Sequence, residues 1–262
     1  MNIHSYAERL LTIDNLSLVL GSKQNLILRD INLYVDNVIR PGKTQGQVVA
    51  LLGLSGSGKT QLFRCIAGLL TPTTGSVVIN SDNHPVIAGE VGVVQQSYPL
   101  MSHRTVISNL MMVTTDRTRA IDLLTKFNLV DKQLLYPSEL SGGQRQRVAI
   151  IQQMLCSNYF ILMDEPFSGL DVIAKDNVCK LINEVTSASE LSTTIFTTHD
   201  IEAAIQVADT IWVLGKESGK EGATVRATYN LIERDLAWNP AVEHHPNFRP
   251  LVEELKQLFG KL

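Results

Sequence analysis

A glycine-rich loop between an apolar run and a helical pattern is the feature that most constrains this chain. Val48–Leu52 is a continuous apolar run of strand length, and it leads into GLSGSGKT over residues 53–60. From Lys59 to Leu70 the apolar residues recur at helical spacing. A strand, a loop of the pattern GxxxxGK[ST] and a helix, in this order, are typical of a site that binds nucleoside triphosphates. The bare pattern arises by chance in roughly one chain in a hundred of this length.

The residue types in this loop suit a phosphate ligand. Glycines let backbone N–H groups turn towards a phosphate, and the helix that follows directs the positive end of its dipole at the same point. Lys59 would reach the β- and γ-phosphates, and the Thr60 hydroxyl would ligate Mg²⁺. The residues of the loop that we expect to contact the nucleotide are Gly53, Ser55, Gly56, Ser57, Gly58, Lys59 and Thr60.

An acidic pair ends a second apolar strand. Tyr159–Met163 is followed by Asp164 and Glu165, and the carboxyl ends of strands are where an α/β sheet holds its ligands. We expect Asp164 to ligate Mg²⁺ through water and Glu165 to poise the attacking water, either as its base or by orienting it. An isolated Asp-Glu pair would more often be solvated surface, but its place downstream of the phosphate loop favours the functional interpretation.

The sequence LSGGQ at 140–144 narrows the class of nucleotide-binding protein. Ser141 and the amides of Gly142 and Gly143 would open a helix and form an anion site without an obstructing side chain. The motif resembles the signature of the ABC transporter ATPase family. In that family it closes over the γ-phosphate held by a second subunit. The resemblance implies a head-to-tail dimer around two ATP molecules, with Gln144 as a further nucleotide contact.

Another stretch resembles the Q-loop of the same family. Val94–Tyr98 contains two adjacent glutamines, Gln95 and Gln96. The resemblance implies that Gln96 senses Mg²⁺ and the attacking water and takes part in catalysis, with Gln95 as the neighbouring alternative.

Two more segments complete the family's set. Ser168–Asp171 resembles the D-loop, which crosses the dimer interface, and this makes Asp171 an expected contact near the nucleotide. Thr197–Asp200 resembles the switch region, in which His199 would contact the γ-phosphate. A lone histidine is more often structural, but its place at the end of an apolar strand downstream of the acidic pair favours the catalytic role.

The resemblance predicts an α/β fold: a P-loop NTPase core of ABC type, an N-terminal antiparallel β subdomain and an inserted helical subdomain. Ile31, Leu33 and Val35 alternate with polar residues, as expected for a half-buried antiparallel strand. Helical patterns prevail from about residue 105 to 156. The predicted organisation is an ATPase domain over 1–232, with the helical insertion at about 97–158, and a linker with an amphipathic helix over 233–262.

Composition limits the functions that the chain can have. A formal net charge of −3 over 262 residues disfavours a nucleic-acid binder. The distant residues Cys65, Cys156 and Cys179 are typical of reduced, buried thiols. The polar start and the lack of a run of eighteen apolar residues predict neither a secretory signal nor a membrane span. Together with these features, the resemblance to ABC transporter ATPases implies a peripheral protein on the cytoplasmic side of the membrane, working with permease subunits and, in an importer, a substrate-binding protein.

The chain departs from the family pattern at two places. Leu18, Val19 or Leu20 stands where the family usually has an aromatic residue that stacks on adenine, which predicts poor discrimination between ATP and GTP. The hairpin 36–45 is longer than usual; of two interpretations, a docking element and a solvated extension that carries Arg40 and Lys43, we expect the second.

Three functions compete. Pro137-Ser138-Glu139 and Pro166-Phe167 look like importer ATPases, and the tail around Phe248 and Leu251 loosely resembles the nitrate/sulfonate/taurine importers. The first alternative is a soluble ABC-type ATPase that acts on ribosomes or nucleic acid, a class that usually has two cassettes or a long coiled coil. The second is a non-transport regulatory ABC protein, a class that tends to lose the acid or the histidine. The transported solute and the choice between a homodimer and a heterodimer stay open.

Overall fold

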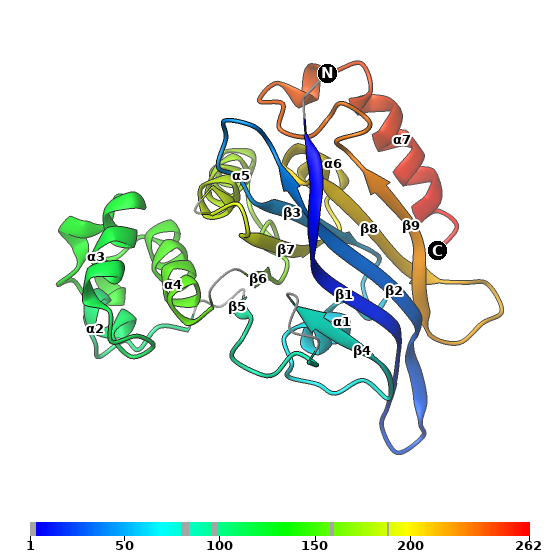
Figure 1. The fold of residues 1–262 in the computed structure, drawn as a ribbon, viewed down its shortest axis with the longest axis horizontal. Coiled ribbons are helices and arrows are strands. Elements are labelled where there is room, and N and C mark those ends of the chain that lie inside the picture. The colour runs from blue at the N-terminus through cyan, green and yellow to red at the C-terminus, as the bar shows by residue number, and fades with distance from the viewer. Residues whose placement is uncertain (1–3, 80–83, 96–98, 158–159, 188) are drawn as a thin grey trace.

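The structure, a computed structural model, describes residues 4–79, 84–95, 99–157, 160–187 and 189–262. Within these residues, one mixed sheet has nine strands in the order β4-β1-β2-β9-β8-β3-β7-β6-β5 (Figure 1). The strands are β1 Ser5–Leu20, β2 Asn25–Ile39, β3 Gln47–Leu52, β4 Thr74–Ile79, β5 Gly92–Val94, β6 Phe160–Met163, β7 Thr193–Thr198, β8 Thr210–Lys216 and β9 Ala223–Asn230. The α-helices are α1 Lys59–Ile66, α2 Val106–Leu110, α3 Arg117–Lys126, α4 Gly142–Cys156, α5 Val172–Thr186, α6 Ile201–Val207 and α7 Phe248–Phe259. Short 3₁₀ helices are η2 Val130–Lys132, η3 Pro137–Glu139 and η4 Val242–His244.

The parallel half of the sheet is built around β3. This strand pairs in parallel with β7 on one side and β8 on the other, and β7, β6 and β5 continue the parallel order. Every residue of β3 is buried, as expected for a strand covered on both faces. Val48, Ala50 and Leu52 belong to one apolar cluster, whereas Val49 and Leu51 belong to the other. The apolar run predicted as a buried parallel strand is confirmed.

The N-terminal half of the sheet is antiparallel. The strands β1 and β2 form a long twisted ribbon that also pairs with β4 (Figure 1). Ile31, Leu33 and Val35 are buried, while Asn32 and Tyr34 between them are exposed. This alternation confirms the strand that was predicted from period two.

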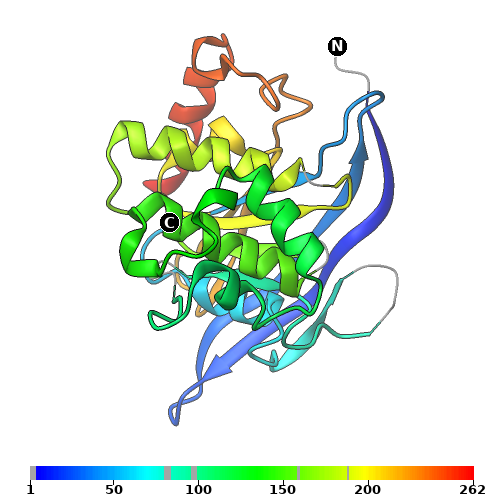
Figure 2. The ribbon, with the colours of Figure 1, turned by 90° about the vertical axis from the view of Figure 1, so that its left-hand side faces the viewer.

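The helices α2, α3 and α4 form a separate green block beside the sheet (Figures 1 and 2). Their buried side chains, such as Leu110, Leu124 and Val148, share the apolar cluster of the parallel strands. The predicted limits of the helical subdomain, about 97–158, stay a prediction. The fold of the chain as a whole agrees with the expected mixed α/β class. No helix among the residues that the structure describes has the length and apolar character needed to span a membrane.

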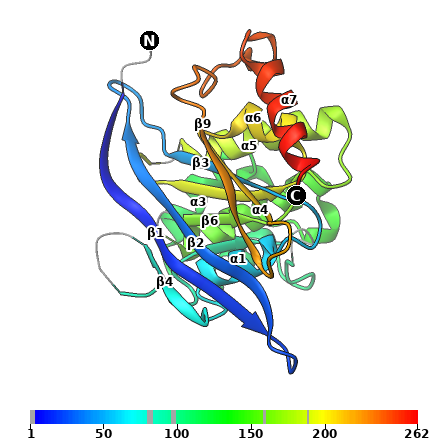
Figure 3. The ribbon, with the colours of Figure 1, turned by 90° about the vertical axis from the view of Figure 1, so that its right-hand side faces the viewer.

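The C-terminal helix α7 lies against α6 (Figure 3). Phe248, Leu251 and Leu255 are buried in the cluster that also contains α5 and α6. The helix ends at Phe259, three residues before the predicted end, and Gly260 caps it. The last residue, Leu262, folds back onto Gly215 of β8, where an added Cβ would lie 2.5 Å from a Leu262 methyl carbon.

The expectation of a solvated Arg40 is wrong. Arg40 is buried, and its guanidinium lies 3.9 Å from the centre of the Trp238 ring. The indole and the nearby carboxylate of Asp209 give this cation a stacking partner and a counter-charge. The side chain thus joins the end of β2 to the tail. Cys156 also departs from expectation, since it is exposed at the end of α4 while the other two cysteines are buried.

Asp209 is a buried acid at the start of β8. Its carboxylate accepts a hydrogen bond of 2.8 Å from the Val48 amide, and its main-chain oxygen accepts one of 2.8 Å from the Leu231 amide. Burial raises the pKa of Asp209 to about 7, although the Val48 amide, the Arg40 charge and the Trp238 side chain lower it. The residue ties β3, β8 and the tail together, and its carboxyl group keeps its proton to a higher pH than an exposed aspartate would.

We expect Asp209→Asn to remove a pH dependence of stability. Between about pH 4 and 7 the unfolded chain ionises Asp209 while the folded chain keeps its proton, so wild-type stability falls as the pH rises. Asparagine retains an oxygen for the Val48 amide without titrating. Urea unfolding at pH 5, 6, 7 and 8 should show the difference between variant and wild type moving in favour of the variant by roughly 1 kcal/mol per pH unit up to pH 7. A difference that is independent of pH would contradict this account.

Leu251→Ala should destabilise the whole chain by about 2–5 kcal/mol, because it leaves a cavity in the shared core. Glu253→Ala, on the exposed side of the same helix, is the matched control and should change stability by less than about 0.5 kcal/mol. Urea unfolding in a Trp238→Phe background, which leaves Trp212 as the only tryptophan, followed by fluorescence and by circular dichroism tests this. Loss of helix signal with an unchanged Trp212 transition would show instead that residues 233–262 unfold independently.

Candidate nucleotide-binding site

The loop 53–58 connects the buried end of β3 to the start of α1. Gly56 and Gly58 adopt φ of 77° and 93°, the left-handed region that favours glycine. Gly53 has no room for a side chain, since an added Cβ would lie 2.6 Å from the Leu214 carbonyl oxygen. These constraints set the turn by which the loop enters the N-terminus of α1.

Lys59 is buried at the base of this loop. Its Nζ donates hydrogen bonds to the carbonyl oxygens of Gly53 (2.8 Å) and Leu54 (3.2 Å). The same nitrogen lies 3.7 Å from Oε1 of Glu165. The predicted phosphate-binding cation and the predicted catalytic acid therefore form one ion pair at the mouth of the loop.

The acidic pair is held in place by a threonine of the neighbouring strand. The Thr197 hydroxyl donates to Oδ1 of Asp164 at 2.6 Å and accepts the amide of Glu165 at 2.8 Å. Glu165 has a φ of 48°, which is uncommon for a residue with a side chain and is typical of functional sites. The sequence analysis placed Thr197 in the switch segment without a role. Its position just before His199 at the end of β7 is the signal that could have identified it.

His199 follows β7 and faces the acid. Its Nδ1 lies 3.0 Å from Oε2 of Glu165, and its side chain is 66% exposed. With a proton on Nδ1, the imidazole donates to the carboxylate and leaves Nε2 at the surface of the site. Lys59, Glu165 and His199 thus form one chain of polar contacts at the carboxyl ends of β3, β6 and β7.

The predicted nucleotide contacts in the 141–144 motif and at Asp171 lie on other elements of the chain. Ser141 caps α4 by accepting the Gln144 amide at 3.3 Å, and Oε1 of Gln144 accepts the Ser141 amide at 2.9 Å. Gly142 and Gly143 are exposed, and no atom lies within 4 Å of an added Cβ at either. Asp171 caps α5 by accepting the Ala174 amide at 2.8 Å.

Within the described residues, no recorded hydrogen bond or ion pair joins the 141–144 motif or Asp171 to the phosphate loop. Gln96 lies outside the described residues. Val172 and Ile173, directly after Asp171, are 84% and 76% exposed. The sequence analysis missed these two as candidate contacts, although apolar residues in the first turn of a helix are a readable signal.

The donors at this edge fit a magnesium-bound triphosphate. Hydroxyl and carboxylate oxygens are the ligands that Mg²⁺ prefers, usually together with phosphate oxygens and water. Thr60 is exposed at the start of α1, and Asp164 is held at the end of β6. The Ser57 hydroxyl oxygen is buried within the loop without a hydrogen-bond partner among the described residues. Buried polar atoms usually have a hydrogen-bond partner, so this hydroxyl stands out among the groups of the loop.

The side of the site expected to hold the base is aliphatic. Leu18 is 1% exposed and belongs to the core, which leaves Val19 and Leu20 as the partly buried residues at this position. On β2, Ile27 and Leu28 border the loop, since an added Cβ at Gly58 would lie 3.4 Å and 3.0 Å from their side chains. No aromatic ring takes part in these recorded contacts at the loop.

Known protein families and proteins match this chain. The ABC transporter family matches residues 42–168. The sulfate/thiosulfate import ATP-binding protein of Pectobacterium atrosepticum is 36% identical over 78% of this chain and 63% of the relative. The protein of the same description from Thermosynechococcus vestitus is 34% identical over 84% of this chain and 66% of the relative. One from Rhizobium meliloti is 36% identical over 71% of this chain and 54% of the relative. The chain therefore spans between about half and two thirds of the length of these relatives.

Solved structures show the same fold. A Clostridium perfringens protein described as part of the ABC transporter complex cbiONQ has a TM-score of 0.73 and 25% identity, covering 96% of this chain and all of that one. A putative metal-chelate type ABC transporter in an inward-facing conformation has a TM-score of 0.63 and 24% identity, over 79% of this chain and 80% of that one. The second likeness concerns the fold alone.

The aliphatic base side predicts that the chain uses GTP nearly as well as ATP, with kcat/KM values within roughly tenfold of each other, because aliphatic side chains offer no hydrogen bond that could distinguish the two purines. Leu20→Tyr and Val19→Tyr, made separately, test which position faces the base. The variant at the facing position should lower the KM for ATP several-fold, and the other serves as its matched control. A strong preference of the wild type for ATP would contradict this prediction.

Proposed function

Because this chain contains the ATP-binding domain of the ABC transporter family, we propose that it binds ATP with Mg²⁺ and hydrolyses it to drive an importer. ATP-binding proteins of this family hydrolyse ATP to power transport. The observation that supports the proposal best is the contact chain Lys59–Glu165–His199 at the mouth of the phosphate loop. It joins a phosphate-binding cation, an acid and a γ-phosphate contact at one edge of the sheet.

In this proposal each side chain has a separate task. Lys59 moves from the carbonyl oxygens of its own loop to the β- and γ-phosphates. Glu165 positions the water whose oxygen bonds to the γ-phosphorus, while the bond from that phosphorus to the bridging oxygen breaks and ADP and phosphate leave. The ring N–H of His199, once it leaves Glu165, would donate a hydrogen bond to the γ-phosphate. Mg²⁺, held by Thr60, Asp164 and Gln96, would neutralise charge that develops on the phosphate oxygens.

We propose that a second ATPase subunit, identical or different, completes the site. Ser141, Gly142 and Gly143 are exposed and offer main-chain N–H groups at the start of α4. Asp171 and the exposed apolar pair Val172 and Ile173 would lie at the same interface, where exposed apolar side chains are buried on association. With Gln144, these residues would close over the ATP held by the loop of the partner.

The partners that we propose beyond the ATPase pair are permease subunits and, for an importer, a substrate-binding protein. The helical part exposes Met101, Met112, Leu134 and Tyr136, which suits docking of a membrane subunit. The chain would then work at the cytoplasmic face of the membrane. The relatives named for sulfate/thiosulfate import make a small oxyanion the first solute to test. The division into an ATPase domain over 1–232 and a C-terminal part over 233–262 belongs to this proposal.

Glu165→Gln should lower ATP turnover at least 100-fold and trap a dimer when ATP is added, because the glutamine side chain keeps the shape but cannot accept a proton. Turnover is measured by phosphate release and the dimer by light scattering. Glu190→Gln, an exposed glutamate remote from the loop, is the control and should behave as wild type.

His199→Ala should lower turnover comparably through loss of the γ-phosphate contact. If the wild-type chain neither turns over ATP nor forms an ATP-dependent dimer when its permease subunits are present, the proposed function is wrong.

A further inference from the structure

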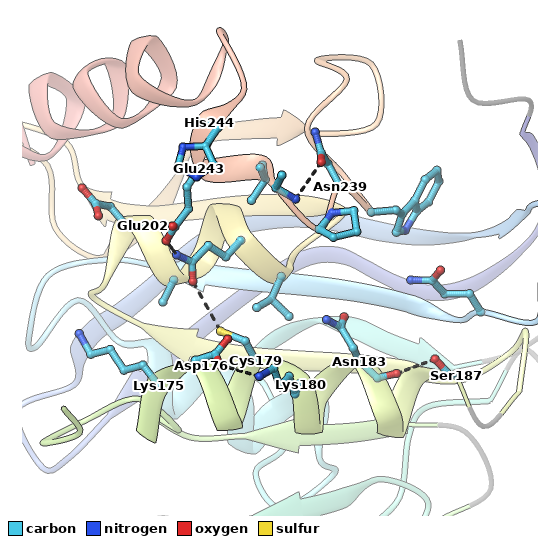
Figure 4. A pocket seen from close by; sticks show the side chains of 18 of the residues that line it. Lys175, Asp176, Cys179, Lys180, Asn183, Ser187, Glu202, Asn239, Glu243 and His244 are labelled. Carbon is cyan, nitrogen blue, oxygen red and sulfur yellow. Dashed lines mark hydrogen bonds and ion pairs between the residues drawn. The ribbon is translucent and has the colours of Figure 1, made fainter. Parts of the chain in front are cut away.

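A groove of about 900 Å³ runs along the outer face of the molecule between α5, α6 and the segment 238–244 (Figure 4). Two side-chain links between α5 and α6 lie along it. Cys179 on α5 contacts Gln206 on α6, with a distance of 3.6 Å between Sγ and Oε1. At the end of the groove nearer to the nucleotide site, the ammonium of Lys175 pairs with the carboxylate of Asp200.

The Lys175–Asp200 pair joins two segments that the proposed reaction uses. Lys175 lies one turn into α5 and its amide bonds to the carbonyl oxygen of Asp171, the N-cap of that helix. Asp200 directly follows His199 and is the N-cap of α6. The pair therefore ties the start of the helix behind Asp171 to the start of the helix behind His199.

Asp200 fixes the main chain at His199 through two interactions besides the pair with Lys175. Its Oδ1 accepts the Ala203 amide at 3.1 Å, and its own amide donates to the Thr198 hydroxyl at 3.0 Å. Its Oδ2 accepts from Lys175. Both oxygens of the Asp200 carboxylate are thus engaged. The residue next to it, His199, is the one that contacts Glu165.

We propose that Lys175 is a positioning residue for ATP hydrolysis, whose ammonium holds the Asp200 carboxylate and thereby fixes the main chain that presents His199 to Glu165. This inference rests on the proposed function. It assigns a role to a residue outside the recognised motifs and links the segment at Asp171 to the switch within one chain.

The electrostatics at Asp200 agree with this role. Burial raises the pKa of Asp200, but the hydrogen bonds from Lys175 and the Ala203 amide and the charges of Lys175 and His199 outweigh it, so that the pKa is lowered. The Asp200 carboxylate therefore stays ionised and keeps both of its bonds.

Position 180 on the same helix offers a matched control. Lys180 also pairs with an aspartate, Asp176, at 2.7 Å, but this pair lies within α5 and is exposed on both sides. Lys180→Met removes the same charge from the same helix without touching α6. Exposed pairs of this kind contribute little to stability.

The decisive experiment compares steady-state ATP hydrolysis of the wild type, Lys175→Met, Lys175→Arg and Lys180→Met. We expect Lys175→Met to lower kcat roughly 10- to 100-fold, the effect of misplacing a catalytic group by about 1 Å. The KM for ATP should stay within about twofold, because the phosphate loop is untouched. Lys175→Arg should restore most of kcat and Lys180→Met should retain all of it.

A second variant separates positioning from simple folding. Asp200→Asn keeps an N-cap for α6 but loses the charge that Lys175 pairs with, so it should match Lys175→Met. The double variant should be no slower than either single variant, because both changes break one interaction. An unchanged kcat in Lys175→Met, an equal fall in Lys180→Met, or a changed KM at constant kcat would overturn the proposal.

Hydrogen exchange makes the inference independent of turnover. In Lys175→Met, but not in Lys180→Met, the amides of residues 199–203 should exchange at least tenfold faster than in the wild type. If the wild type with its permease subunits shows neither ATP hydrolysis nor an ATP-dependent dimer, the proposed function fails, while this measurement still decides whether Lys175 positions the switch. Equal exchange in all three proteins would overturn the positioning role whatever the turnover.

Discussion

The hydroxyl of Thr197 links the two acidic residues of the candidate site to the strand that carries His199. It donates to Asp164 and accepts from the amide of Glu165, and this is possible only because β6 and β7 run in parallel and end at the same level. The same parallel order brings the end of β3 alongside. The catalytic geometry is therefore a property of strand register, and a change that slips β6 against β7 would separate the acid from the histidine without altering either residue.

Much of this arrangement could be predicted from the sequence, because its signals are local. The apolar run before 53–60, the acids after an apolar strand and the histidine after another each indicate the carboxyl end of a parallel strand, and the structure brings all three together. The burial of Arg40 could not be predicted, because its partners Trp238 and Asp209 are about 170 to 200 residues away in the chain. The partner of Lys175 was missed for the same reason, since the pair with Asp200 joins side chains from different elements.

The tail illustrates how one amphipathic pattern can be assigned correctly while its role is missed. The helix was predicted from its apolar spacing, yet spacing does not show what the apolar face covers. In the structure Leu251 and Leu255 complete the core above α6, and Arg249 and Glu243 reach side chains on that helix. The helix that follows His199 is thus supported by the tail on one side and by α5 on the other, which gives the switch a rigid base.

Lys59 gives the phosphate loop an ion pair of its own. The ammonium is bonded to two main-chain oxygens and lies beside the Glu165 carboxylate. In the proposed function, nucleotide binding at this loop would be an exchange of partners, in which a triphosphate takes the cation from groups that already satisfy it. The exchange would separate the carboxylate from the cation, so that the step that binds the substrate is also the step that frees the acid. A nucleotide too short to reach the lysine would leave the ion pair intact.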